Sequence, residues 1–312
     1  MKTTNSLENI ISVVSEQSKN HLDRIVAVND MRFSSLKQIN IAGQSFRVLT
    51  SAQRLLANRL RVPYSYLSRC PEDLQADNLN YWIRQESRNR QNLFCRFDGN
   101  HLRAVFTERY TPIDNLEVLH KMSDYGFNLD QKIQFSMDEE MMLVKVPEYN
   151  RSFLLAENDK VVPGISIVNS EVGILALSIE AFYYRLVCTN GLISKTKVDA
   201  RYKHISRKVM DEFPMVLEGV ISQSRYGHDR FRISAETAVD NPESSIETFA
   251  RQFQISQEQT QIIKHAFYEE PGLTMFHIIN AFTRAAQNSV LSATEAYQLE
   301  KTAGTILGMV KS

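Results

Sequence analysis

The stretch Glu171–Lys197, EVGILALSIEAFYYRLVCTNGLISKTK, joins an alternating apolar segment to a run of basic residues. Its odd-numbered positions are apolar from Leu175 to Tyr183, and Arg185 ends the pattern. Side chains of a β-strand point alternately to opposite faces, so this period predicts a strand with one face in a core. The strand would deliver Arg185 and the lysines after it to one edge of a sheet.

Two features near the end of this stretch leave alternatives open. Asn190-Gly191 predicts a hairpin turn with a positive φ angle, but the same pair also ends helices, so the segment after Ser178 is either strand or helix. Cys188 is either a nucleophile activated by nearby lysines or a small buried apolar residue. A cysteine directly after Tyr-Arg-Leu-Val favours the packing role.

Several short alternating segments precede this stretch and predict a β-rich centre. One hairpin joins two of them through Asp98-Gly99-Asn100, and a second crosses Met137–Glu140. The predicted strands are 25–28, 38–41, 45–49, 93–97, 101–106, 132–135, 141–146, 161–169 and 173–187.

Helical periodicity dominates the rest of the chain, above all its C-terminal third. The fold class predicted is α+β, with a central mixed or antiparallel sheet built from hairpins and a helical C-terminal region. The regions are 1–204 and 205–312, either as two domains or packed as one. The predicted helices are 5–19, 51–61, one starting near Pro71, 114–124, 205–225, 243–252, 256–268, 273–287 and 292–310.

Composition narrows the function classes. The 312 residues hold 36 basic and 36 acidic side chains, so the net charge gives no reason to expect a polyanionic partner. Three distant cysteines indicate reduced thiols in the cytoplasm, and we expect neither a secretory signal nor a membrane span. No metal-ligand spacing, phosphate loop or dinucleotide motif occurs, so no cofactor, no metal and no catalytic residue is expected.

The basic residues are unevenly distributed. Between Arg185 and Lys208 seven basic residues face the single acid Asp199, a net charge of +6. Such a cluster in a neutral chain indicates an anion-binding surface, although a solvated helix start looks the same.

A second basic cluster, RNRQNLFCRFDGNHLRAVFTERYTPIDN, begins at Arg88 and interleaves arginines with aromatic residues. Alternation would place Phe94 and Arg96 on one face of the hairpin, and Cys95 and Phe97 on the other. Arginines and aromatic rings on an exposed sheet hold single-stranded nucleic acid by neutralising phosphates and stacking on bases. The alternative is that the aromatic rings belong to a core and the arginines form ion pairs around it.

Two acids, Glu171 and Glu180, lie within largely apolar segments. A buried carboxylate needs a partner, and Arg185 or Arg103 would provide one. A metal-dependent enzyme acting on nucleic acid would use such acids, and this is a third hypothesis for the function.

Four motifs occur in order along the chain: RAVFTERYTPIDN (103–115), GISIVNSEVG (164–173), YRLVCTNGLIS (184–194) and NAFTRAA (280–286). Together they resemble the phage/plasmid-like protein family, a domain of unknown function found on bacteriophages, plasmids and other mobile elements. The family pattern has serine where this chain has Thr107, and threonine keeps the hydroxyl group. The resemblance runs from about Val62 to Gly304 and implies these signature residues: Arg103, Arg109, Tyr110, Asn169, Ser170, Glu171, Gly173, Arg185, Cys188, Asn190 and Gly191.

The order of strands followed by a long helix is also similar to the β-β-β-α core of phage single-strand annealing proteins. Those proteins form rings or filaments and bind DNA in a basic groove. This similarity implies a single-stranded DNA partner, a role in annealing or recombination, and a homo-oligomer. The alternative is an anti-defence factor that binds a host protein and no DNA. The residues predicted to contact DNA are Arg96, Arg103, Arg109, Tyr110, Arg185, Lys195, Lys197, Arg201 and Lys203.

Overall fold

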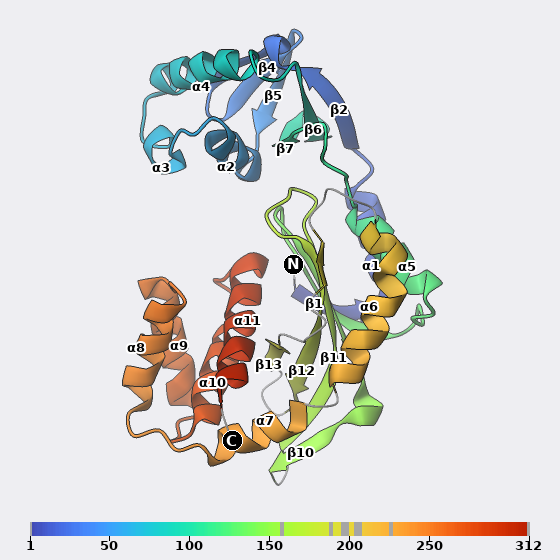
Figure 1. The fold of residues 1–312 in the computed structure, drawn as a ribbon, viewed down its shortest axis with the longest axis vertical. Helices are drawn as coiled ribbons and strands as arrows, with labels where there is room; N and C mark the ends of the chain where they lie inside the picture. Colours follow the sequence, from blue (N-terminus) through green and yellow to red (C-terminus); the bar gives the residue numbers. More distant parts are fainter. Residues whose placement is uncertain are drawn as a thin grey trace.

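The computed structural model describes residues 2–156, 159–186, 190–194, 200–202, 208–224 and 227–310. Two β-sheets, each with its own helices, form two units (Figure 1). The N-terminal unit comprises residues 21–106 and is inserted into the large unit, because β1 (Lys2–Ser6) and α1 (Leu7–Gln17) belong to the latter. The two units have separate hydrophobic cores.

The N-terminal unit is a six-stranded sheet in the order β2-β6-β7-β5-β4-β3. Only the β5–β7 pair is parallel, so the sheet is mixed. Its helices pack their apolar sides on one face of the sheet. The elements are β2 (His21–Ala27), η1 (Val28–Asp30), β3 (Met31–Ser35), β4 (Gln38–Ile41), β5 (Gln44–Val48), α2 (Thr50–Arg59), α3 (Tyr64–Leu67), α4 (Glu72–Glu86), β6 (Asn92–Asp98) and β7 (His101–Phe106).

The first predicted hairpin is confirmed. Strands β6 and β7 pair antiparallel, and Gly99 between them has a φ angle of +53°. Cys95 and Phe97 lie in the core, whereas Phe94 and Arg96 point to the other face, as the alternation predicts.

The large unit contains an eight-stranded sheet in which every described pair is antiparallel. Its main path is β1-β8-β9-β11-β12-β13, with β10 on β11 and β14 on β12. The hairpin of β8 and β9 is the second one predicted from sequence. The further elements are β8 (Lys132–Met137), β9 (Met142–Pro147), η2 (Tyr149–Arg151), β10 (Phe153–Ala156), β11 (Asp159–Asn169), β12 (Leu177–Arg185), β13 (Asn190–Ser194) and β14 (Ala200–Tyr202).

The alternating stretch forms the central strand β12, which excludes a helix after Ser178. Leu177, Ile179 and Tyr183 lie in the main core, while Phe182 packs on the opposite face. The strand begins at Leu177 and not at Gly173, because Gly173 has a φ angle of +72° in the turn that precedes it.

The predicted turn at Asn190-Gly191 is wrong. Both residues lie in β13, where Gly191 pairs with Tyr184, and Gly191 is not among the glycines with positive φ. A Cβ atom at Gly191 would lie 2.4 Å from the ring of Phe182. Close packing therefore requires glycine at this position, not a turn. The sequence alone does not distinguish these two reasons for a glycine.

Helices cover both faces of the large sheet (Figure 1). Helix α6 follows the antiparallel strands and packs on β11 and β12. Helices α10 and α11 pack on β13, and capping boxes start α9 and α11. The helices are α5 (Asn115–Asp124), α6 (Lys208–Ser224), α7 (Gly227–Glu236), α8 (Pro242–Gln252), α9 (Gln257–Glu269), α10 (Met275–Ala285) and α11 (Ala293–Met309).

The architecture is α+β, as predicted, and the predicted C-terminal helices are present. Strands β1, β3, β10, β13 and β14 and helices α3 and α7 were not anticipated, because they are short or have weak periodicity. The predicted boundary near residue 205 falls inside the large unit, since residues on both sides share one core. Among the described helices, none is long and apolar enough to span a membrane.

Candidate functional site

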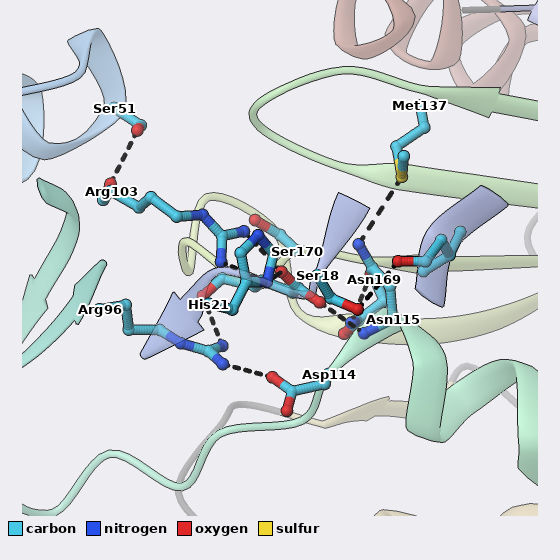
Figure 2. A network of polar contacts seen from close by, with 12 residues as sticks. Ser18, His21, Ser51, Arg96, Arg103, Asp114, Asn115, Met137, Asn169 and Ser170 are labelled. Carbon is cyan, nitrogen blue, oxygen red and sulfur yellow. Dashed lines mark hydrogen bonds and ion pairs between the residues drawn. The ribbon is translucent and has the colours of Figure 1, made fainter. Parts of the chain in front are cut away.

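The two units meet at a polar junction (Figure 2). The hairpin β6–β7 brings Arg96 and Arg103 to it from the N-terminal unit. The large unit provides the turn between β11 and β12, with Glu171, and the start of α5, with Asp114 and Asn115. We call this set of contacts the junction.

Glu171 is the centre of the junction and is 4% exposed. Its carboxylate accepts hydrogen bonds from Arg103 Nη2 at 2.5 Å and from the backbone N–H of Asn115 at 2.8 Å. Its backbone carbonyl accepts from Arg96 Nη1 at 3.0 Å and from the Tyr110 hydroxyl at 3.2 Å. Burial alone would raise the pKa of Glu171, but Arg103 and the backbone donor hold it below its ordinary value. Glu171 is therefore ionised and bound by both units.

Arg96 is the largest fully buried side chain of the N-terminal unit, and it is 1% exposed. Its Nε donates to Asp23 at 2.9 Å, and its Nη2 pairs with Asp114. Burial alone would lower the pKa of Arg96, but Asp114 and Asp23 outweigh this and hold it above the ordinary value. All three guanidinium nitrogens have acceptors, so this arginine has a structural role in the observed conformation.

His21 lies beside this arginine network. Nη1 of Arg103 lies 2.9 Å from Nδ1 of His21, and Glu171 Oε2 is 3.6 Å from the same nitrogen. Because a guanidinium can only donate, His21 Nδ1 is the acceptor and the imidazole is neutral. Burial and then Arg103 lower the pKa of His21.

Asn169 and Ser170 fix the turn that presents Glu171. Asn169 Nδ2 donates to the carbonyl of Ile113 at 3.0 Å and to Asn115 Oδ1 at 2.9 Å. The Ser170 hydroxyl donates to the carbonyl of Glu140 at 2.5 Å and accepts from the backbone N–H of residue 174 at 3.1 Å. Both side chains therefore join the turn to neighbouring segments of the large unit.

An aromatic stack completes the junction. The rings of Phe106 and Tyr110 are parallel, with centroids 3.7 Å apart, and Phe94 packs beside Tyr110. A Cβ atom at Gly173 would lie 2.6 Å from Phe106, so the turn can approach the stack only with glycine. The signature residues from two separate motifs thus come together in one place.

The family model described as Domain of unknown function (DUF932) matches residues 103–312. The chain belongs to the DUF932 family. No curated protein and no solved structure matches it. The match begins inside β7, so Arg103, Tyr110 and Glu171 lie within the DUF932 domain, whereas Arg96 and His21 precede it.

Arg185, one of the signature residues named from sequence, is held by two acids in the large unit. Its Nε donates to Asp159 at 2.8 Å, and its Nη1 and Nη2 donate to Glu270 at 2.8 and 2.7 Å. Asn280, in the fourth motif, also donates to Glu270, and the guanidinium lies 4.9 Å from the ring centroid of Phe276. Arg185 ties β12 to the C-terminal helices.

Glu180 lies in a different environment from Glu171. Its carboxylate accepts from the Tyr297 hydroxyl at 3.0 Å and from Lys301 Nζ at 2.7 Å, both on α11. Of the partners considered from sequence, Arg103 does pair with Glu171, but neither arginine pairs with Glu180. In the part of the chain that the structure describes, no three His, Cys, Asp or Glu side chains form a group suited to a metal ion.

The residues predicted to contact DNA are divided between three locations. Arg96, Arg103 and Tyr110 are in the junction, Arg185 is ion-paired inside the large unit, and Arg109 is exposed after β7. Arg201 lies in β14 and Asn190 in β13, and nothing is described of their side chains. Lys195, Lys197, Lys203 and the signature residue Cys188 lie outside the described residues.

Sequence reasoning missed four members of the junction: His21, Asp23, Asp114 and Asn115. Asp114 and Asn115 end the first motif, PIDN, which is a usable signal because Asp favours the position before a helix. His21 and Asp23 gave no signal, since a short edge strand with alternating polar residues is usually solvated.

Proposed function

We propose that this DUF932 protein binds single-stranded DNA and acts as an annealing or recombination factor of a phage or plasmid. The supporting observation is that a strongly basic segment is attached to the edge of the large sheet that β13 and β14 form. The mobile-element origin rests on the four sequence motifs.

The basic segment starts and ends at that edge. Strand β13 pairs with Ala181–Arg185 of β12, and β14 pairs with Leu177–Ile179 of the same strand. Both occupy the side of β12 that is not paired with β11, so together they form the edge. The chain leaves this edge at Ser194, returns at Ala200, and then runs to α6.

The basic segment contains few acidic residues that could neutralise its charge. The acids Asp159 and Glu270 neutralise Arg185, so it does not contribute to a positive surface. From Lys195 to Lys208 six further basic residues face only Asp199, a net charge of +5. Clustered cations of this kind attract the phosphates of a nucleic acid and release their counterions.

A salt titration tests the proposal. The full chain is mixed with a labelled single-stranded oligonucleotide, and anisotropy gives the dissociation constant at increasing salt. Replacing Lys195, Lys197 and Lys203 by alanine removes three phosphate contacts, so we expect the slope of log K against log salt to fall by about 2. The matched control replaces Lys19, Lys37 and Lys132, which are exposed elsewhere, and leaves the slope unchanged.

Two results would overturn the proposal. One is no retention of the oligonucleotide even at low salt, which would favour the alternative of a host protein as the partner. The other is an equal loss of affinity in the control variant, because binding would then depend on total charge and not on this edge. Size-exclusion chromatography with and without DNA tests the proposed ring or filament.

A further inference from the structure

The N-terminal unit has a groove between the C-terminal ends of α2 and α4. The groove has a volume of about 860 Å³, and its floor is formed by Val105 and Phe106 of β7. Its walls are formed by Leu55, Asn58, Arg59, Leu60, Arg61, Trp82, Gln85, Glu86, Asn89 and Arg90. It precedes the matched DUF932 region almost entirely, and none of its wall residues belongs to the family signature.

Cations outnumber acids in this groove. Glu86 is the one carboxylate among the lining residues, and it is shared by Arg59 at 3.5 Å and Arg90 at 3.4 Å. The buried Nε of Arg59 has no hydrogen-bond partner, and Arg61 is exposed. A buried guanidinium N–H without an acceptor is costly, so an anionic ligand would stabilise this arrangement.

An exposed tryptophan lies in the same groove. Trp82 is 43% exposed on α4, and its ring is held edge-on by Tyr81, with centroids 5.1 Å apart. The amides of Asn58, Gln85 and Asn89 line the groove with it and offer both donors and acceptors. A large exposed indole beside arginines and amides suits a ligand that combines a planar ring, polar ring edges and negative charge.

The end of α2 positions Arg61. Arg61 has a φ angle of +56°, and the backbone N–H groups of Arg61 and Val62 donate to the carbonyls of Asn58 and Ala57. These are the bonds that commonly close the C-terminus of a helix. The cap ends α2 and places Arg61 among the residues that line the groove.

We propose that this groove binds a nucleotide of single-stranded DNA, with the base stacked on Trp82 and the phosphate between Arg59, Arg61 and Arg90. This inference rests on the proposed function and adds a second contact site, on a different unit from the basic edge. Phe106 connects the groove to the junction, because its ring lines the groove and stacks on Tyr110.

The chain provides its own probe for this site, because Trp82 is its one tryptophan. Titrating the full chain with oligo(dT) should quench the fluorescence of Trp82 over the same concentration range in which anisotropy reports binding. An abasic backbone of the same length has the phosphates without the bases, and should bind with little quenching. Replacing Trp82 by alanine should weaken oligo(dT) binding about 5-fold or more, since stacking on one base is lost.

Charge variants test the other half of the site. R61A/R90A should lower the salt slope by about 1.4, the value for two lost phosphate contacts. The control R69A/R251A removes the same charge from exposed positions outside the groove and should leave the slope and the quenching unchanged.

The outcomes separate the two proposals. Binding by anisotropy with no change in Trp82 fluorescence, and with unaltered affinity for R61A/R90A, overturns the groove and leaves the proposed function standing. No binding by either signal overturns both. Quenching by an acidic peptide as strong as that by oligo(dT) also overturns the groove assignment, because the site would then select charge and not a base.

Discussion

Two groups of arginines in this molecule differ in the acids around them. At the junction, Arg96 and Arg103 meet Asp23, Asp114 and Glu171, and both arginines are largely buried. In the groove of the N-terminal unit, the one acid among the lining residues, Glu86, pairs with Arg59 and Arg90, and Arg61 and Arg90 are exposed. The first group holds two units together, whereas the second has positive charge available for a ligand.

This difference explains why clusters of arginine and aromatic residues are ambiguous in a sequence. The hairpin β6–β7 has the pattern expected of a nucleic-acid-binding sheet. The large unit, however, covers the part of its polar face that holds Arg96 and Arg103. The ratio of acids to arginines in space, together with burial, separates the two roles. Spacing along the chain does not.

Among these variants, replacing Arg96 by leucine should lower the free energy of unfolding most. The substitution leaves Asp23 and Asp114 without their cation and removes one of the two donors to the backbone carbonyl of Glu171. Breaking a buried ion pair costs about 3–5 kcal/mol, and the partial exposure of both aspartates puts the expected loss near the lower limit, about 3 kcal/mol. Urea unfolding followed by circular dichroism measures it. Arg109→Leu, at an exposed position, is the control and should change stability by less than about 0.5 kcal/mol.

Replacing Glu171 by glutamine should have the next largest effect. The shape is kept, but the charge that Arg103 contacts is lost, which costs about 2 kcal/mol at neutral pH. The pKa of Glu171 is lowered in the folded state, so its contribution is present above the unfolded value near 4.5 and is lost as pH falls through the folded pKa. The difference between the two proteins should therefore shrink in acid. A constant difference at all pH values would contradict this assignment.

A smaller effect is expected at His21. Its folded pKa lies below the ordinary value of 6.5, so the unfolded chain binds the proton first and stability falls as pH drops below that value. His21→Gln keeps a hydrogen-bond acceptor and cannot titrate, so unfolding curves should depend less on pH between about 7 and 5. His277 has the same direction of pKa shift and remains in the variant, so some dependence should persist. An unchanged pH profile would show that His21 does not titrate in this way.

The smallest effect on stability is expected in the groove. R61A/R90A removes charges that are not needed for folding, so the free energy of unfolding should change by no more than about 0.5 kcal/mol. If thermal unfolding shows a loss as large as that of Arg96→Leu, these arginines are structural and the comparison fails.

Local patterns allowed much of the fold to be predicted. Strand β12, the hairpin at Gly99 and the helices after residue 241 depend on alternation, turn residues and caps that lie within a few positions of one another. Gly191 shows the limit, because its requirement comes from the ring of Phe182 on the neighbouring strand. A local pattern indicates that glycine is needed but not the reason.

The junction was harder to predict because its partners are distant. Arg96 and Asp23 are 73 residues apart, and Arg103 and Glu171 are 68 residues apart. Apolar surroundings were enough to show that Glu171 needs a cation. They were not enough to find Lys301, the partner of Glu180 at a separation of 121 residues.

The insertion of the N-terminal unit has a practical consequence for dissecting this protein. A fragment cut where the DUF932 match begins would divide the β6–β7 hairpin and remove Arg96 while leaving Asp114 and Glu171 behind. It would also discard β1 and α1, which pair with β8 and pack in the core of the large unit. The start of the match is therefore not a place where the chain can be cleaved without exposing the edge of β8 and depriving Asp114 of its cation.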